Sequence, residues 1–154
     1  MTNNKARYEI MYHLISADES KYDHEASFRD NGIIDWNQYG KAGKKCVLPG
    51  DHVFIYYSNE MRYIRFECDV TEIAIPYDMK RSDKQYWKVE EPRDNSIVYM
   101  RLKPIRVIPP NLITLDNLKD LGINPPQKRI TISGDALKTI LERFDEYGMP
   151  YPME

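Results

Sequence analysis

The sequence has few of the features that mark several common protein classes. It contains two cysteines, Cys46 and Cys68, in 154 residues, which is too few for a secreted disulfide scaffold, and their spacing is not that of a metal site. No apolar run approaches the roughly 20 residues that span a bilayer, and residues 1–9 lack the apolar segment of a signal peptide. We therefore expect a cytoplasmic protein with no membrane partner.

Motifs of several enzyme classes are also missing. His13, His24 and His52 form no HxH, HExxH or His-Cys-Cys grouping, so a zinc site has no visible ligand set. No GxSxG, GxGxxG or GxxxxGK[ST] occurs, which leaves out hydrolase elbows and nucleotide phosphate loops. Asp51 and Glu67 lack the acidic-x-Lys pattern of metal-dependent nucleases, because an aspartate stands at the lysine position. We expect no catalytic residue, no metal and no cofactor.

Length and composition are those of an ordinary globular protein. At 154 residues, 42% hydrophobic and 30% charged, the chain is long enough to bury a core, and we expect one domain over residues 1–154. The formal charge of −2 provides no whole-molecule attraction to nucleic acid. Basic residues outnumber acidic ones between Lys41 and Arg106, which is compatible with a locally basic face or simply with a solvated surface.

The chain is organised around residues 48–70. Pro49-Gly50-Asp51 is typical of a turn, and residues 52–58 follow as a β-branched and aromatic run that is apolar on both parities. This pattern predicts a central strand covered on both faces. The next run alternates, with Ile64 and Phe66 on the same side and polar residues, Glu67 among them, facing water.

The remaining segments predict short helices around more strands. Strands are expected over 7–16 and over 97–108, the latter with a bulge near Pro104. The alternating run that includes Ile64 is expected to continue as a strand up to Pro76. Helices are expected over 24–30, between Thr114 and Gly122, and between Ser133 and Gly148. Residues 77–95 are polar and predict a long loop or lid. Together these elements predict an α+β fold with a curled or barrel-like sheet of about five to six strands and a C-terminal helix packed on it.

Aromatic residues stand beside polar ones at several points. Trp36 lies in a segment expected to be a loop, next to Asn37, and Trp87 follows Tyr86 in the polar excursion. Ring faces can stack on a flipped base while amide or hydroxyl groups contact its edge. The same residues can equally serve as core-edge packing, and the pattern alone does not decide between these roles.

An ordered set of segments resembles the EVE domains of the PUA-like superfamily, especially the bacterial branch associated with restriction and defence. The segments are KYDHEASF (21–28), IIDWNQ (33–38), LPGDHVFIYYSN (48–59), IRFECDV (64–70) and YMRLKPI (99–105). The resemblance implies a PUA-like pseudo-barrel flanked by short helices. It also implies a non-catalytic DNA-binding module that flips a modified base, such as methylated or hydroxymethylated cytosine, into an aromatic pocket. The sequence shows no nuclease part, so we expect either that a separate nuclease partner cuts or that the chain is a fragment of a larger protein.

Residue roles follow from the resemblance position by position. The implied base pocket comprises Tyr22, Asp23, Trp36, Asn37, Tyr57, Ser58 and Trp87. The expected contacts to the nucleic-acid backbone are Lys41, Lys44, Lys45, Arg62, Lys128 and Arg129. The sequence departs from the family pattern where Gln127-Lys128-Arg129 lacks a glycine and where Ala17 replaces a frequent asparagine.

Three other functions stay open at this point. PUA-like folds also bind RNA, so an RNA-binding module is one alternative. An ASCH-like amidohydrolase acting on a modified nucleoside is another, for which Lys103 and Glu67 are the only candidate residues. A plain interaction domain is the third.

Overall fold

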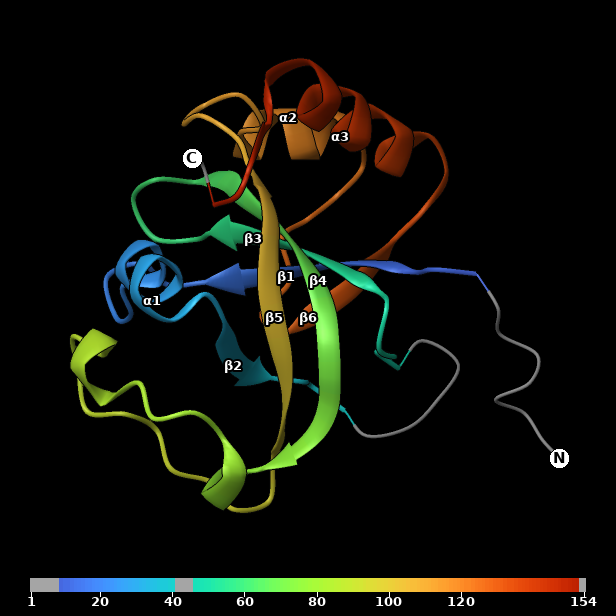
Figure 1. Ribbon diagram of the computed structural model, residues 1–154. Coiled ribbons are helices and arrows are strands. Elements are labelled where there is room, and N and C mark those ends of the chain that lie inside the picture. The colour runs from blue at the N-terminus through green and yellow to red at the C-terminus, as the bar shows by residue number, and fades with distance from the viewer. Residues whose placement is uncertain (1–8, 41–45, 153–154) are drawn as a thin grey trace, which may run out of the picture.

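The computed structural model describes residues 9–40 and 46–152 as a curled mixed sheet with helices around it (Figure 1). The strands are β1 (Tyr12–Ala17), β2 (Ile34–Asn37), β3 (His52–Tyr57), β4 (Tyr63–Pro76), β5 (Val98–Val107), β6 (Arg129–Ile132) and β7 (Met149–Pro150). The helices are α1 (His24–Asn31), α2 (Leu115–Asp120) and α3 (Gly134–Tyr147). The strand order is β2-β5-β4-β3-β1-β6, with β7 paired to β5. The predicted α+β class with a curled sheet is confirmed.

The predicted central strand is confirmed as β3. It pairs in parallel with β1 and antiparallel with β4, and every residue from Val53 to Tyr57 is buried. One apolar cluster, which contains Ile55 and Phe66, lies on one side of the sheet, and a second, with Phe54 and Phe144, lies on the other. Apolar residues of both parities are therefore buried, as a strand covered on both faces requires.

The helices begin and end where local signals predict. Asp23 caps α1 through its side chain, and Gly32 ends the helix with a left-handed φ of 76°. Thr114 forms a capping box with Asn117 at the start of α2. At the end of α3, Gly148 has an ordinary φ of −72°. A glycine suits that position because an added Cβ would lie 2.5 Å from the Phe144 carbonyl oxygen.

Two bulges set which side chains face which side of the sheet. The bulge predicted near Pro104 is confirmed, since Glu67 pairs with Arg106 while Cys68 pairs with Pro104. A second one is unexpected: Ile55 pairs with Phe66 but Tyr56 pairs with Ile64. Ile64 therefore joins the cluster on the opposite side from Phe66, and the prediction that the two share a face is wrong.

Glu67 was expected to face water, and the structure corrects this. Its side chain is 2% exposed and binds His52 Nδ1 at 2.7 Å and Arg106 Nε at 2.7 Å. Arg106 also contacts Asp145 of α3 at 2.6 Å, so the helix covers the face that the alternation left open. Burial raises the pKa of Glu67, but the bonds to His52 and Arg106 outweigh it and lower the pKa overall.

Three strands, β2, β6 and β7, were not predicted from the sequence, and β7 pairs with β5. The segment with Trp36, expected to be a loop, forms β2 and pairs with β5, and β6 pairs with β1.

Within the described residues, no helix combines the length and apolar character of a membrane span. Over the same residues, no group of three or more His, Cys, Asp or Glu side chains is placed to hold a metal ion.

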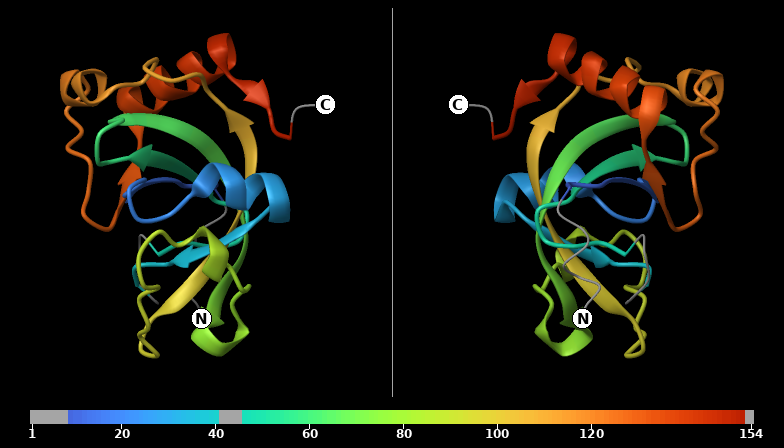
Figure 2. Two further views of the ribbon diagram at one scale, coloured as in Figure 1. Left: turned by 90° about the vertical axis from the view of Figure 1, so that its left-hand side faces the viewer. Right: turned by 90° about the vertical axis from the view of Figure 1, so that its right-hand side faces the viewer.

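The covering segment, residues 77–97, joins β4 to β5 and contains two short 3-10 helices. Both views of Figure 2 show it at the opposite end of the sheet from α2 and α3. Its backbone joins the rest of the chain through a bridge between Tyr22 and Trp87. The segment predicted as a loop or lid therefore covers one end of the sheet.

Candidate functional site

A cavity of about 800 Å³ opens between the ends of β1 and β3 and the covering segment. This volume lies within the range of about 300–1,000 Å³ typical of small-molecule pockets. The residues that line it are Ser16, Asp18, Lys21, Tyr22, Asp35, Trp36, Asn37, Tyr39, Tyr56, Ser58, Arg62, Lys80, Trp87, Glu91, Pro92, Ile97, Tyr99, Leu115, Pro125, Pro126 and Gln127.

Three rings, Tyr22, Trp36 and Trp87, form what we term the aromatic wall of the cavity. The two indoles are nearly parallel, at 5° and with ring centroids 5.8 Å apart. Tyr22 lies 5.1 Å from Trp36 and 4.9 Å from Trp87, roughly perpendicular to both. A planar ligand between two rings needs about 7 Å, two contact distances of roughly 3.5 Å. The two indoles are therefore too close together to admit a planar ligand between them.

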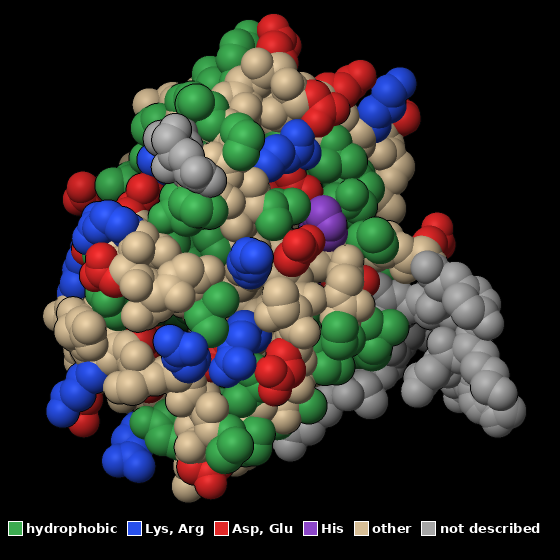
Figure 3. Space-filling view, in the orientation of Figure 1, with side chains coloured by type: hydrophobic (Ala, Val, Ile, Leu, Met, Phe, Trp, Pro, Cys, Tyr) green, Lys and Arg blue, Asp and Glu red, His purple; other side chains and the backbone are tan. Residues whose placement is uncertain are grey.

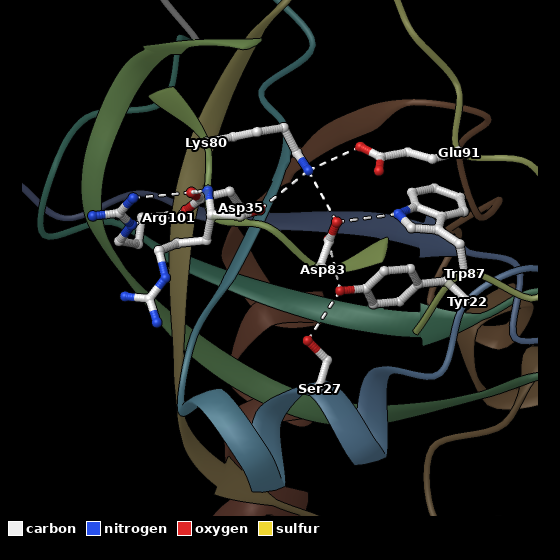
Figure 4. A network of polar contacts seen from close by, with 9 residues as sticks. Tyr22, Ser27, Asp35, Lys80, Asp83, Trp87, Glu91 and Arg101 are labelled. Atoms are coloured by element: carbon white, nitrogen blue, oxygen red, sulfur yellow. Dashed lines mark hydrogen bonds and ion pairs between the residues drawn. The ribbon is translucent and has the colours of Figure 1, made fainter. Parts of the chain in front are cut away.

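A buried carboxylate, Asp83, lies behind the aromatic wall (Figure 4). It accepts hydrogen bonds from the Tyr22 hydroxyl at 2.8 Å, from Lys80 Nζ at 3.0 Å and from Trp87 Nε1 at 3.3 Å. Lys80 also donates to Glu91 at 2.9 Å. Burial lowers the pKa of Lys80, but the bonds to Glu91 and Asp83 outweigh it and raise the pKa overall. The network therefore contains a protonated lysine at neutral pH.

A second buried carboxylate, Asp35, joins the covering segment to the sheet. The Arg101 guanidinium of β5 donates to both oxygens of Asp35 in β2, at 2.8 and 2.9 Å. The backbone N–H of Arg81 donates to the same carboxylate at 2.7 Å. The Asp35 side chain is fully buried, so each bond replaces water that this carboxylate has lost.

Cations and carboxylates are balanced around the cavity. Lys21 and Arg62 are exposed on its lining, and Lys21 lies 3.9 Å from Asp18. Arg62 sits in the turn between β3 and β4 and adopts a left-handed φ of 55°. Figure 3 shows basic side chains interspersed with acidic ones over the visible face. Neither the cavity lining nor this face therefore has a large area of one charge that would attract an anionic ligand over a distance.

Most of the side chains expected at a base pocket come together here. Tyr22, Trp36, Asn37, Ser58 and Trp87 all line the cavity. Their gathering depends on the covering segment, which brings Trp87 beside Tyr22, which precedes α1, and beside Trp36 of β2.

Two residues expected in the pocket do not line it. Asp23 turns back to accept a hydrogen bond from the Ala26 N–H at 3.0 Å, as the cap of α1. Tyr57 packs in the same apolar cluster as Tyr22 and Trp36, but its hydroxyl points into the protein and donates to Glu25 at 2.7 Å. Its neighbour Tyr56 lines the cavity in its place, because successive side chains of a strand face opposite sides.

The expected backbone contacts separate into three groups. Arg62 lines the cavity, and Lys41, Lys44 and Lys45 lie outside the described residues. Lys128 is exposed but is not part of the lining. Arg129 has a structural position: its guanidinium donates to the carbonyl oxygens of Gln38 at 3.0 Å and Tyr39 at 3.1 Å.

Most of the charged residues that line the cavity, and Asp83 beside it, were not predicted from the sequence. Asp35, Lys80, Asp83 and Glu91 gave no spacing signal, since they come together only in the folded chain. The lysine and carboxylate named for an amidohydrolase are elsewhere: Lys103 is exposed on β5 and Glu67 is buried under α3, and neither lines the cavity.

The fold is shared with several solved structures. A hypothetical protein from Leishmania major matches with a TM-score of 0.61 and 15% identity over 90% of this chain and 96% of its own. A protein from Pseudomonas putida matches with a TM-score of 0.59 and 15% identity over 86% and 98%. The ASCH protein from Zymomonas mobilis matches with a TM-score of 0.51 and 14% identity over 85% and 94%.

Comparisons of the sequence alone gave no relative. No protein-family model matches it, and no curated protein does. At these identities the structural matches concern the fold only. The chain therefore has an α+β fold consistent with that of the ASCH protein, with a half-barrel sheet and three helices.

Proposed function

We propose that this chain is a non-catalytic nucleic-acid-binding module that takes one extruded base into the cavity, and that the base is a modified one in DNA. The observation that carries the proposal is the aromatic wall beside a cavity of about 800 Å³. Stacking on an aromatic side chain contributes about 1–3 kcal/mol per base. The cavity is larger than one unmodified base needs, which leaves room for a substituent.

Polar groups around the cavity suit the other parts of a nucleotide. The Asn37 side-chain oxygen accepts from the Tyr39 N–H at 2.8 Å, which leaves the Asn37 amide N–H groups to donate to a carbonyl on the base edge. Lys21 and Arg62 are exposed on the lining, where a flanking phosphate would meet them. The proposed module holds and reads a base, and cleavage of the strand falls to a separate nuclease partner.

We also propose a specific family for this chain. Within the PUA-like superfamily, the succession of sequence segments most resembles EVE domains of restriction and defence systems, and this is the family that we propose. Trp36 is the stacking residue and Asn37 the edge-reading residue in this assignment.

A binding screen tests the proposal. Duplexes of one sequence carrying unmodified, methylated, hydroxymethylated or glucosylated bases are compared with the same sequence as RNA, using the parent protein and Trp36→Ala. Loss of one stacking contact should weaken binding of the preferred duplex by roughly 5- to 150-fold. Tyr147→Ala, which removes an exposed aromatic ring of α3 outside the cavity lining, should leave binding unchanged.

Three results would count against this function. Equal binding by the parent and Trp36→Ala would remove the cavity from the interaction. Preference for RNA would replace the DNA assignment with the RNA-binding alternative. Absence of any nucleic-acid affinity at low salt would leave a plain interaction domain.

An amidohydrolase is the second candidate function. The observation that favours it is a lysine on the cavity lining, Lys80, whose side chain is buried beside the carboxylates of Asp83 and Glu91. Its three N–H donors are directed to Asp83, Glu91 and the Arg81 carbonyl oxygen, which is the arrangement of a structural cation and not of a free base. Release of cytidine from acylated cytidine, abolished in Lys80→Met, would establish the enzyme in place of the binding module.

A further inference from the structure

We propose that Asp83 is the positioning residue of the site: it sets the geometry of the aromatic wall without touching the ligand. This inference rests on the proposed function, because it assigns a role in holding the surface on which a base stacks. Asp83 is 5% exposed and is not part of the cavity lining.

One carboxylate joins parts of the chain that are distant in sequence. Its Oδ2 accepts from the hydroxyl of Tyr22, which precedes α1, and its Oδ1 accepts from the Trp87 indole and from Lys80. Figure 4 shows these groups converging on Asp83 from opposite sides. The Tyr22 hydroxyl is also bonded to Ser27 of α1 at 3.0 Å. Asp83 therefore links the start of α1 to the covering segment.

The ring geometry depends on this link. Trp87 is half-buried and lies at the end of the short helix Lys84–Tyr86. Its indole N–H makes one hydrogen bond within the described residues, to Asp83. The parallel arrangement with Trp36 and the perpendicular arrangement with Tyr22 need a fixed rotation of that indole. A charge-assisted hydrogen bond fixes both direction and distance, whereas apolar contact alone permits the ring to slide.

The alternative is that Asp83 only neutralises Lys80. In that case the ring arrangement would survive its replacement, because the backbone bridge between Tyr22 and Trp87 would still place the two residues side by side. The two interpretations predict different spectra for the unliganded protein. The chain has two tryptophans, both in the aromatic wall, so the tryptophan signal reports this wall alone.

The experiment measures circular dichroism in the tryptophan bands and nucleic-acid affinity for Asp83→Asn and Asp83→Leu. Two indoles this close couple electronically, and their circular dichroism depends on the angle between their transition moments. We call the part of the signal that Trp36→Phe abolishes the paired band. We expect both Asp83 variants to reduce this paired band and to weaken binding by roughly tenfold. Asp51→Asn is the matched control: Asp51 is a buried carboxylate, 3% exposed, outside the cavity lining, and its loss should leave the paired band intact.

Tyr22→Phe keeps the experiment decisive if the Asp83 variants do not fold. It removes the hydroxyl bonded to Asp83 and keeps the ring, so it should also reduce the paired band. An unchanged band in the folded Asp83 variants, or in Tyr22→Phe where those do not fold, would overturn the positioning role. Failure of the parent protein to bind nucleic acid would overturn the proposed function instead, while the spectrum of the unliganded protein would still decide the role of Asp83.

Discussion

Protonation of His24 should make the stability of this protein depend strongly on pH. His24 is 2% exposed, and its ring lies 4.7 Å from Tyr22, 4.8 Å from Trp36 and 5.8 Å from Tyr57. Neither ring nitrogen makes a well-formed hydrogen bond within the described residues. Burial lowers the pKa of His24 from 6.5 to about 4, and the nearby Tyr22 backbone and Asp23 carboxylate offset only part of this effect.

The sign of the effect follows from proton binding in the two states. In the unfolded chain His24 takes up a proton near its ordinary pKa, whereas in the folded chain it stays neutral until about pH 4. Between these values the unfolded state binds more protons, so acidification favours unfolding. A difference of 2.5 pKa units (6.5 minus 4) corresponds to about 3 kcal/mol, of which roughly 2.5 kcal/mol is lost by about pH 4.5.

Comparison with His24→Phe isolates this contribution. Phenylalanine keeps a ring against the aromatic wall and carries no titrating group, while the carboxylates that also affect acid stability are present in both proteins. Urea unfolding followed by circular dichroism gives the free energy of unfolding at each pH. We expect the difference between variant and parent to grow in favour of the variant by roughly 2.5 kcal/mol from about pH 7 to about pH 4.5. Parallel curves for the two proteins would refute the reasoning.

Two further substitutions test the packing of the sheet. Arg101→Met leaves the buried Asp35 carboxylate without its bidentate partner and should lower the free energy of unfolding by about 3 kcal/mol, whereas Met at the exposed Lys103 of the same strand should change it by less than about 0.5 kcal/mol; equal urea midpoints for the two would contradict the assignment. Phe144→Ala removes the α3 ring stacked 5.5 Å from Phe54 and should cost about 3–5 kcal/mol, with a loss below about 1 kcal/mol showing that α3 does not hold this face.

Local signals accounted for much of the fold. The end of α1 was predicted because Gly32 is a helix stop that the local sequence encodes, whereas its cap, Asp23, was instead expected in the base pocket. The central strand was predictable because a run that is apolar on both parities suits only a strand covered on both faces. Strand β2 was not predicted, because the alternation of Ile34 and Trp36 with Asp35 and Asn37 covers only four residues, the shortest run that indicates a strand. What makes it a strand is its pairing with β5, more than 60 positions away.

The candidate site was predictable only in part, for the same reason. Trp36 and Trp87 were predicted in the pocket because each is a large ring in a polar stretch, and both line the cavity. Tyr57 was expected in the pocket, but it packs in the apolar cluster beside the aromatic wall and does not line the cavity. The sequence does not show which side chains at the end of a strand meet an opening. Asp83 and Lys80 stand in a polar stretch that is typical of a solvated loop, and only the fold shows that they are buried.

The buried charges explain how the cavity stays open. The covering segment has few apolar residues to pack against the sheet, and an apolar seal would fill the space that a ligand needs. Directed bonds hold it instead: the Arg81 N–H to Asp35, Lys80 to Asp83 and Glu91, and the Tyr86 hydroxyl to Asp30 at 2.9 Å. Buried ion pairs add little net stability over apolar packing, but their bonds fix position and direction. A covering segment held at its edges by such bonds can lie over an open cavity, which is the arrangement that a site for a single inserted ring requires.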